Sequence, residues 1–111
     1  MPGTTVVIPN YNGMKYIDRC LCSLYQGTRI PEVILVDNGS RDGSKELVRE
    51  KYEKVRIIEF QENIGFSGAV NAGIRASSTE YVLLLNNDTE VDKEMVENLE
   101  KVLSQEPRAF C

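Results

Sequence analysis

Four short apolar segments divide the chain, and each is followed by a stretch whose apolar residues recur at helical spacing. The apolar segments cover residues 4–8, 33–36, 55–58 and 81–85. The first, second and fourth are continuous rather than alternating, which is typical of strands that are covered on both faces, as in a parallel sheet. The pattern therefore predicts four strands in one largely buried sheet.

The stretches that follow the strands have the pattern of amphipathic helices. Helices are predicted over about residues 13–26, 42–53 and 67–76, and from about Asp92 until Pro107. The first carries Met14, Ile17, Leu21 and Leu24 on one stripe, and Asp42 is predicted to cap the second. The alternation of strand and helix predicts βαβ units in a three-layer α/β/α sandwich with a mainly parallel sheet. We expect residues 1–111 to form a single domain, with a further strand beginning at 109–111.

Composition and charge narrow the function classes. The chain has 111 residues, a net charge of -4 and no Lys/Arg cluster, so a nucleic-acid groove is disfavoured. Its three cysteines and lack of histidine argue against a zinc site. Cys20 and Cys22 lie two apart on a predicted helix and point in different directions, so we expect reduced thiols and a cytoplasmic location. The longest apolar run, Val82 to Leu85, is too short to span a membrane.

Every predicted strand is followed by a short polar segment. These segments are residues 9–12, 37–40, 62–65 and 86–89, and each contains asparagine. Asparagine and aspartate are common in any turn, so one such segment means little. In a parallel α/β sheet, however, the carboxyl ends of the strands share one edge, and ligands bind beyond it. The sequence therefore predicts a ligand site lined by amides and carboxylates.

Asp88 and Asp37 are the acidic candidates in these segments. Asp88 follows the most apolar strand and could bind a divalent cation, because a hard cation prefers oxygen ligands and Mg²⁺ often takes only one or two carboxylates. It could instead cap the next segment. Asp37 could accept a hydrogen bond from an imide N–H or a ribose hydroxyl, or could cap the following helix, and the sequence alone does not separate these roles.

One aromatic residue and two glycines are further candidates for the ligand site. Tyr11 offers a flat face for a base, or it could pack against the first helix as a hydrophobic staple. Gly65 and Gly68 could let the backbone approach a ligand, although tight packing of helix on sheet explains them equally well.

Four motifs in order resemble the family-2 inverting glycosyltransferases of the GT-A fold, in particular a rhamnosyltransferase-like branch. They are Val6-Val7-Ile8-Pro9-Asn10-Tyr11-Asn12-Gly13, residues 36–44 (VDNGSRDGS), residues 62–68 (ENIGFSG) with Asn71-Ala72-Gly73, and residues 84–89 (LLNNDT). Together they cover nearly the whole chain. The resemblance implies that the chain is the Rossmann-like, nucleotide-sugar-binding N-terminal portion of such an enzyme.

The resemblance also assigns residues to roles. It places Pro9, Asn10 and Tyr11, with the neighbouring Asn12, against the nucleotide, Asp37 against the pyrimidine ring and Asn87 near the ribose or sugar. Gly65, Gly68 and Asn71 would flank the donor pocket, and Asp88 would bind the Mg²⁺ or Mn²⁺ ion that bridges the diphosphate. Two departures stand out: Asn86-Asn87-Asp88 has one carboxylate where many relatives have more, and Asn38 replaces a common second aspartate. Metal affinity should therefore be modest without the nucleotide.

The activity implied is transfer of a sugar, with inversion, from a UDP- or dTDP-sugar to a glycan, lipid-linked or other hydroxyl acceptor in cell-surface polysaccharide synthesis. In the family the catalytic base lies after the metal motif, so no catalytic residue is assigned here, and we expect donor binding without turnover. The full-length protein could be peripheral at the inner face of the membrane. A strand order of 3-2-1-4 would leave the fourth strand at an edge and favour self-association.

Three alternatives were weighed against this interpretation. The chain could be a non-catalytic nucleotide-binding or structural module. A sugar-nucleotide pyrophosphorylase should carry a basic, glycine-rich loop after the first strand, whereas this loop has no arginine. A dinucleotide-binding dehydrogenase should carry G-x-G-x-x-G there, which is also missing.

Overall fold

The computed structural model describes residues 3–105 and contains four strands that alternate with four helices. The strands are β1 (Thr4–Asn10), β2 (Glu32–Asn38), β3 (Arg56–Phe60) and β4 (Tyr81–Leu84), and the helices are α1 (Ile17–Tyr25), α2 (Ser44–Lys51), α3 (Phe66–Ala76) and α4 (Met95–Gln105). The predicted helix end at Pro107, the predicted strand at 109–111 and Cys111 lie outside the described residues.

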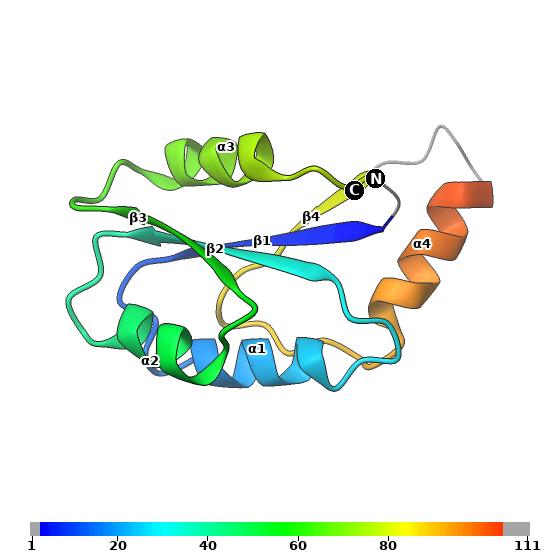
Figure 1. Ribbon diagram of the computed structural model, residues 1–111, viewed down its shortest axis with the longest axis horizontal. Helices are drawn as coiled ribbons and strands as arrows, with labels where there is room; N and C mark the ends of the chain where they lie inside the picture. The colour runs from blue at the N-terminus through cyan, green and yellow to red at the C-terminus, as the bar shows by residue number, and fades with distance from the viewer. Residues whose placement is uncertain (1–2, 106–111) are drawn as a thin grey trace.

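The four strands form one parallel sheet in the order β3-β2-β1-β4. Helices α1 and α2 cover one face of the sheet and α3 covers the other, as Figure 1 shows, while α4 lies near the end of the sheet where the strands begin. The predicted three-layer α/β/α sandwich with a mainly parallel sheet is therefore confirmed, and so is the strand order 3-2-1-4.

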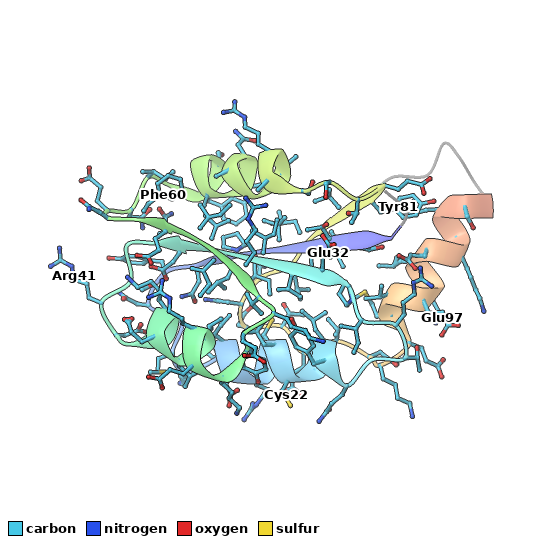
Figure 2. The ribbon with its side chains drawn as sticks, in the orientation of Figure 1. Cys22, Glu32, Arg41, Phe60, Tyr81 and Glu97 are labelled. Atoms are coloured by element: carbon cyan, nitrogen blue, oxygen red, sulfur yellow. The ribbon has the colours of Figure 1, made fainter. Side chains whose placement is uncertain are left out.

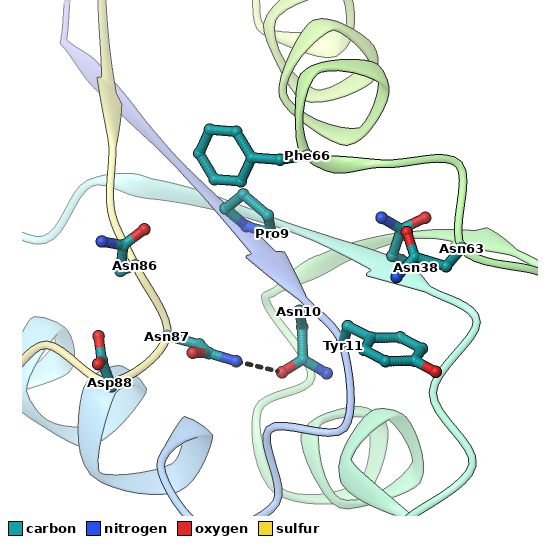
Figure 3. A pocket seen from close by; sticks show the side chains of 9 residues that line it. All are labelled: Pro9, Asn10, Tyr11, Asn38, Asn63, Phe66, Asn86, Asn87 and Asp88. Atoms are coloured by element: carbon teal, nitrogen blue, oxygen red, sulfur yellow. Dashed lines mark hydrogen bonds between the residues drawn. The ribbon is translucent and has the colours of Figure 1, made fainter.

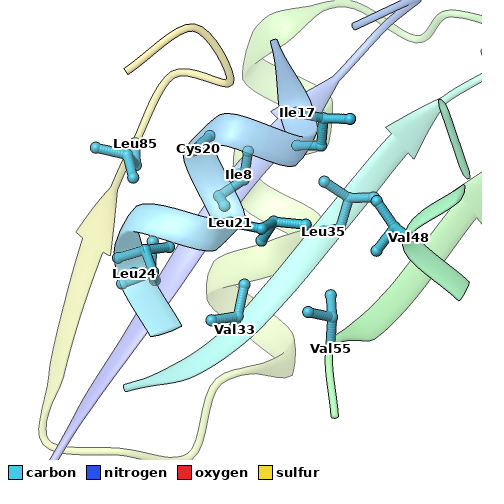
Figure 4. Close-up of a cluster of buried hydrophobic side chains, with 11 residues drawn as sticks. Ile8, Ile17, Cys20, Leu21, Leu24, Val33, Leu35, Val48, Val55 and Leu85 are labelled. Carbon is cyan, nitrogen blue, oxygen red and sulfur yellow. The ribbon is translucent and has the colours of Figure 1, made fainter. Parts of the chain in front are cut away.

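Successive residues of the central strands point into two different cores. Val6 and Ile8 of β1 and Val33 and Leu35 of β2 pack under α1 and α2 (Figure 4), whereas Val7 of β1 packs under α3. Side chains alternate between the faces of a strand, so a strand buried on both faces must be apolar at every position. This explains the continuous apolar runs in the sequence.

Both central strands run further than the apolar pattern predicted. Pro9 and Asn10 are the last residues of β1, where Asn10 is in register with Asp37, and Asn38 at the end of β2 is in register with Phe60. Strand pairing depends on the backbone, so the ladder continues after the apolar side chains stop. These polar residues are consequently fixed by the sheet rather than held in loops.

Three of the four described helices begin later than the sequence predicted, whereas α3 begins at Phe66, one residue before its predicted start. Residues 13–16 form a turn before α1, in which the amides of Tyr16 and Ile17 both donate to the Gly13 carbonyl. Gly43, not Asp42, is the N-cap of α2, although Asp42 still accepts the Ser44 amide. Helix α4 begins at Met95 rather than near Asp92. Polar residues that could cap a helix occur in clusters here, which makes the starting residue hard to predict.

The two described cysteines are free. Cys20 is buried in the core under α1, and Cys22 is exposed on the outer side of the same helix, as Figure 2 shows. The predicted divergence of the two thiols is confirmed. Within residues 3–105, no helix combines the length and apolar character needed to cross a membrane.

Candidate functional site

An open pocket of about 330 Å³ lies at the carboxyl ends of the strands. Its lining residues, drawn in Figure 3, are Pro9, Asn10, Tyr11, Asn38, Asn63, Phe66, Asn86, Asn87 and Asp88. They come from the ends of β1 and β2, from the segments after β1, β3 and β4, and from the first residue of α3. The pocket thus occupies the edge of the sheet where the sequence predicted a ligand site.

The pocket forms because β1 and β4 separate. Their register ends at Val7 and Leu84, followed by one further hydrogen bond from the Leu85 amide to the Val7 carbonyl. Pro9 lies two residues further along β1, so its nitrogen, which has no hydrogen to donate, faces the side from which β4 has departed. Here β1 connects to β2 on one side of the sheet and β4 arrives over the other, so the pocket lies at the topological switch point, where α/β sheets bind ligands.

After β4 the chain turns toward α1. The Cys20 thiol lies 3.8 Å from the Asn86 carbonyl oxygen, and the Val91 amide donates to the Ser23 hydroxyl at 3.1 Å. Arg19 of α1 also pairs with Glu90 at 3.3 Å. These contacts hold the segment that carries Asn87 and Asp88 against α1.

Asn10 is the centre of a buried polar network. Its side chain is 1% exposed, and its amide nitrogen lies 3.1 Å from Asp37 Oδ1 and 3.0 Å from the Ser44 hydroxyl. Its amide oxygen accepts a hydrogen bond of 2.9 Å from Asn87 Nδ2. One side chain therefore links β1, β2 and the start of α2 to the segment that carries Asp88.

The side chains of Asp37 and Asn38 are both occupied by hydrogen bonds to neighbouring protein groups. Asp37 is fully buried, and besides Asn10 it accepts the Ser40 amide at 3.0 Å. Asn38 accepts the Ile64 amide at 2.8 Å and donates to the Gly65 carbonyl at 3.1 Å. In this structure Asp37 therefore positions Asn10 and the turn after β2, and Asn38 fixes the segment between β3 and α3.

Asn12 and Asp42 tie the loop after β1 to the loop after β2. Asn12, at a φ of 51°, accepts the Arg41 amide at 2.9 Å, and its own amide donates to the Ser40 hydroxyl at 2.8 Å. Asp42 accepts the Met14 amide at 2.9 Å. The wall of the pocket that contains Tyr11 is thereby fixed by polar contacts.

Acid should loosen this pair of loops. Partial burial alone would raise the pKa of Asp42, but hydrogen bonds from the Ser44 side chain and from the Met14 and Ser44 amides outweigh it and lower the pKa. A lowered folded-state pKa gives stability that is present above the unfolded-state pKa and is lost as the pH falls through the folded-state pKa. The variant Asp42→Ala should therefore show a shallower loss of stability below about pH 4 in urea denaturation.

The acid effect should be reduced in this variant but not removed. Hydrogen bonds from Lys51 to Asp18 and from Arg49 to Glu59 also lower the pKa values of those carboxyls. An unchanged pH slope in Asp42→Ala would contradict the role given to Asp42.

Asp88 differs from the other carboxylates at this edge of the sheet. It is exposed, and among residues 3–105 its carboxylate has no hydrogen-bond or ion-pair partner. Burial and then the nearby charge of Asp88 raise the pKa of the Cys20 thiol to about 11. The carboxylate thus lines the pocket, and no group in the described part of the chain compensates its charge. A helix-capping residue would accept a backbone amide, whereas an unpaired carboxylate is suited to bind a cation.

The donor set fits a hard cation that shares its coordination with a ligand. The described residues contain no group of three acidic, histidine or cysteine side chains able to enclose a metal by themselves. A single carboxylate beside the amides of Asn86 and Asn87 can bind Mg²⁺ or Mn²⁺ when water and phosphate oxygens complete the shell. None of the nine lining residues is Lys or Arg, so the cation would be the main positive charge for a bound diphosphate.

The structure brings half of the sequence-predicted site residues to the pocket. Pro9, Asn10, Tyr11, Asn87 and Asp88 line it. The other predicted residues, Asn12, Asp37, Gly65, Gly68 and Asn71, do not line it, and Asn71 is exposed on α3.

Four lining residues were not among the predicted site residues: Asn38, Asn63, Asn86 and Phe66. The three asparagines belong to the polar post-strand segments or directly adjoin a strand end, which is a signal the sequence contained. Phe66 is 57% exposed at the first position of α3. Its exposure is visible only in the structure; in the sequence, the one signal is a large apolar residue directly after Gly65 at the end of a polar post-strand segment.

The fold and the pocket define a doubly wound α/β domain of the kind that binds its ligand at a topological switch point. The model of the family described as "Glycosyl transferase family 2" matches residues 5–111. The chain therefore belongs to glycosyl transferase family 2.

Relatives and solved structures agree with this membership. Glycosyltransferase GlyA of Streptococcus pneumoniae serotype 4 is 37% identical over 101 residues, which are 87% of this chain and 14% of that protein. Glycosyltransferase AglE of Haloferax volcanii is 34% identical over 103 residues, which are 87% of this chain and 34% of that protein. The chain thus spans about a seventh to a third of the length of these relatives.

Two solved structures share the fold. Staphylococcus aureus TarS 1-349 in complex with UDP-GlcNAc has a TM-score of 0.85 and 26% identity, covering 95% of this chain and 32% of that chain. Mannosyltransferase PcManGT from Pyrobaculum calidifontis, in complex with GDP-Man and Mn²⁺, has a TM-score of 0.84 and 27% identity. The match covers 93% of this chain and 32% of that chain. The parallel sheet with its flanking helices therefore matches the GT-A fold of neighbours such as TarS.

Proposed function

We propose that this chain binds a nucleoside-diphosphate sugar with a divalent cation, as the donor-binding part of a glycosyltransferase. The observation that carries the proposal is the unpaired Asp88 carboxylate, held at the mouth of a pocket at the switch point of the sheet. A pyrophosphate needs positive charge, and the lining supplies none without a cation. The sugar nucleotides named for TarS and for the Pyrobaculum mannosyltransferase support this ligand class.

In this proposal the chain's residues have distinct tasks. Tyr11, which is half exposed beside Pro9, offers its ring to the base. Asp88 would hold Mg²⁺ or Mn²⁺, which supplies charge stabilisation for the departing nucleoside diphosphate. The buried network around Asn10 would keep these two parts of the site in register.

Transfer itself is proposed for a longer protein of which this chain would be the N-terminal part. By its resemblance, that protein would pass the sugar with inversion to a glycan or lipid-linked hydroxyl at the cytoplasmic side of a membrane. UDP- and dTDP-sugars, dTDP-rhamnose among them, are the proposed donors, and we propose that the 111-residue chain binds them without turnover.

Calorimetric titration of the 111-residue chain with UDP, dTDP and GDP, each with and without Mn²⁺ or Mg²⁺, tests the proposal. We expect a pyrimidine nucleoside diphosphate to bind, and to bind more tightly with the cation. If circular dichroism shows a folded chain and no nucleotide gives heat under any of these conditions, donor binding is contradicted and a structural module becomes the better description.

We also propose that the outer edge of β4 mediates self-association of this chain. Among residues 3–105, strand β4 pairs only with β1, over four residues, and Leu84 is 42% exposed. Unpaired backbone groups along an apolar edge can pair with a second chain. Light scattering at increasing concentration should show a mass above that of a monomer, and Leu84→Lys should reduce it. A monomer at millimolar concentration would contradict this proposal.

A further inference from the structure

Gly13 lies against the hydrogen bond that connects Asn10 to Asn87. A Cβ atom at residue 13 would fall 2.2 Å from Asn10 Oδ1 and 2.2 Å from Asn87 Nδ2. Gly13 has no positive φ, unlike Gly39, Gly43 and Gly65, so its backbone conformation is open to other residues. Space, not conformational freedom, therefore explains glycine at this position.

The side chains of Asn10 and Asn87 differ in how firmly they are held. Asn10 is buried, and its amide nitrogen is held by Asp37 and Ser44. Asn87 is half-buried, and within the described part of the chain its side chain has one hydrogen bond, the one to Asn10. If residue 13 gained a methyl group, Asn87 would have to move, because Asn10 is fixed on several sides.

Asn87 directly precedes Asp88, so its side chain anchors the peptide that carries the proposed cation ligand. The contacts of this segment with α1 come from residues on both sides of Asn87: Asn86 meets Cys20 and Val91 meets Ser23. Those contacts fix the path of the segment, whereas the Asn10–Asn87 bond fixes it to the end of β1, where Tyr11 begins the other wall of the pocket.

We propose that Gly13 and Asn10 are positioning residues that hold Asn87, and through it Asp88, at the distance from the β1 end that a cation-bound nucleoside diphosphate requires. The inference rests on the proposed function, since it concerns the same site. It adds that recognition of the diphosphate with its cation depends on a residue, Gly13, that contacts neither.

The variant Gly13→Ala tests this directly. Its Cβ should displace the Asn87 amide while leaving the Gly13 carbonyl free to accept the Tyr16 and Ile17 amides that begin α1. We expect the affinity for UDP with Mn²⁺ to fall about tenfold, in the range measured when residues that orient metal ligands are changed. The affinity for uridine without metal, followed by NMR shifts, should not change, because uridine has no diphosphate.

A double-mutant cycle separates positioning from general damage. Asn87→Ala alone should weaken UDP with Mn²⁺ by a similar factor, and adding Gly13→Ala to it should have little further effect, because residues acting through one contact are not additive. Ile17→Val, which removes one buried methylene group from α1, serves as the control for lost stability and should leave both affinities unchanged.

Asn87→Leu provides a second route if Gly13→Ala does not fold. It keeps about the size of the side chain but removes the donor to Asn10 Oδ1 without adding a charge beside Asp88, so it should also weaken the binding of UDP with Mn²⁺. Wild-type affinity in Gly13→Ala, or fully additive losses in the cycle, would overturn the inference while leaving the proposed function intact. Failure of the unsubstituted chain to bind UDP would overturn both.

Discussion

Asp88→Asn should remove most of the cation dependence of nucleotide binding. The substitution keeps the size of the side chain and removes the one charge at the pocket that the described residues leave unpaired. Because the remaining lining groups are amides, aromatic rings and a proline, the cation would lose its only anionic protein ligand. We expect the affinity for UDP with Mn²⁺ to fall roughly 100-fold, measured by calorimetry, since loss of a direct ligand should exceed the loss of a residue that only orients one.

Asp92→Asn is the matched control for this experiment. Asp92 is an exposed carboxylate in the same segment after β4, and it accepts the Glu94 amide rather than facing the pocket. The same loss of charge there should leave the affinity within experimental scatter. If both variants weaken binding equally, general electrostatics would explain the effect, and the assignment of the cation to Asp88 would be wrong.

Asn10→Ala should cause the largest loss of stability of any polar substitution in the site. The change removes hydrogen bonds to Asp37, Ser44 and Asn87 together, and it leaves Oδ1 of the fully buried Asp37 without its bond from Asn10. A buried group left unsatisfied costs about 1–3 kcal/mol, so we expect a loss of about 2–4 kcal/mol in the free energy of unfolding from urea denaturation.

Asn71→Ala is the control for Asn10→Ala. Asn71 is exposed on α3, and alanine is the better helix former, so its substitution should leave stability unchanged or slightly raised. A loss below about 0.5 kcal/mol in Asn10→Ala, the usual range for surface positions, would show that the network around Asn10 contributes little.

Most of the fold could be predicted because positions that become buried are apolar in the sequence. Val6, Val7 and Ile8 are consecutive apolar residues that face alternate cores, so a run of this kind predicts a strand covered on both sides. The same pattern predicted the position of the pocket, because in a parallel sheet the strand ends share one edge. Family membership is also confirmed, and it was carried by four motifs read in order.

The roles of individual polar residues could not be predicted in the same way. Asp37 could have faced a ligand or its own backbone, and both tasks need a hydrogen-bond acceptor at the end of a strand. The structure buries it against Asn10 and Ser40. Asn38 is similarly engaged by Ile64 and Gly65, which only the tertiary approach of the segment after β3 could reveal.

The role of Gly13 could not be predicted from the sequence either. Its importance arises from the close approach of two side chains that are 77 residues apart in sequence. No local pattern indicates such a contact, and from the sequence Gly13 was only the first residue of the predicted helix over residues 13–26 and the last residue of the first motif.

The central claim is that a cation at Asp88 holds the diphosphate of a nucleotide in the pocket beside Asn10 and Tyr11. A crystal structure of the chain with UDP and Mn²⁺, with anomalous scattering used to locate manganese, tests it most directly. We expect a manganese peak in contact with the Asp88 carboxylate and with diphosphate oxygens. Manganese bound elsewhere, or a nucleotide seated in the pocket while Asp88 turns away to accept backbone amides, would contradict it.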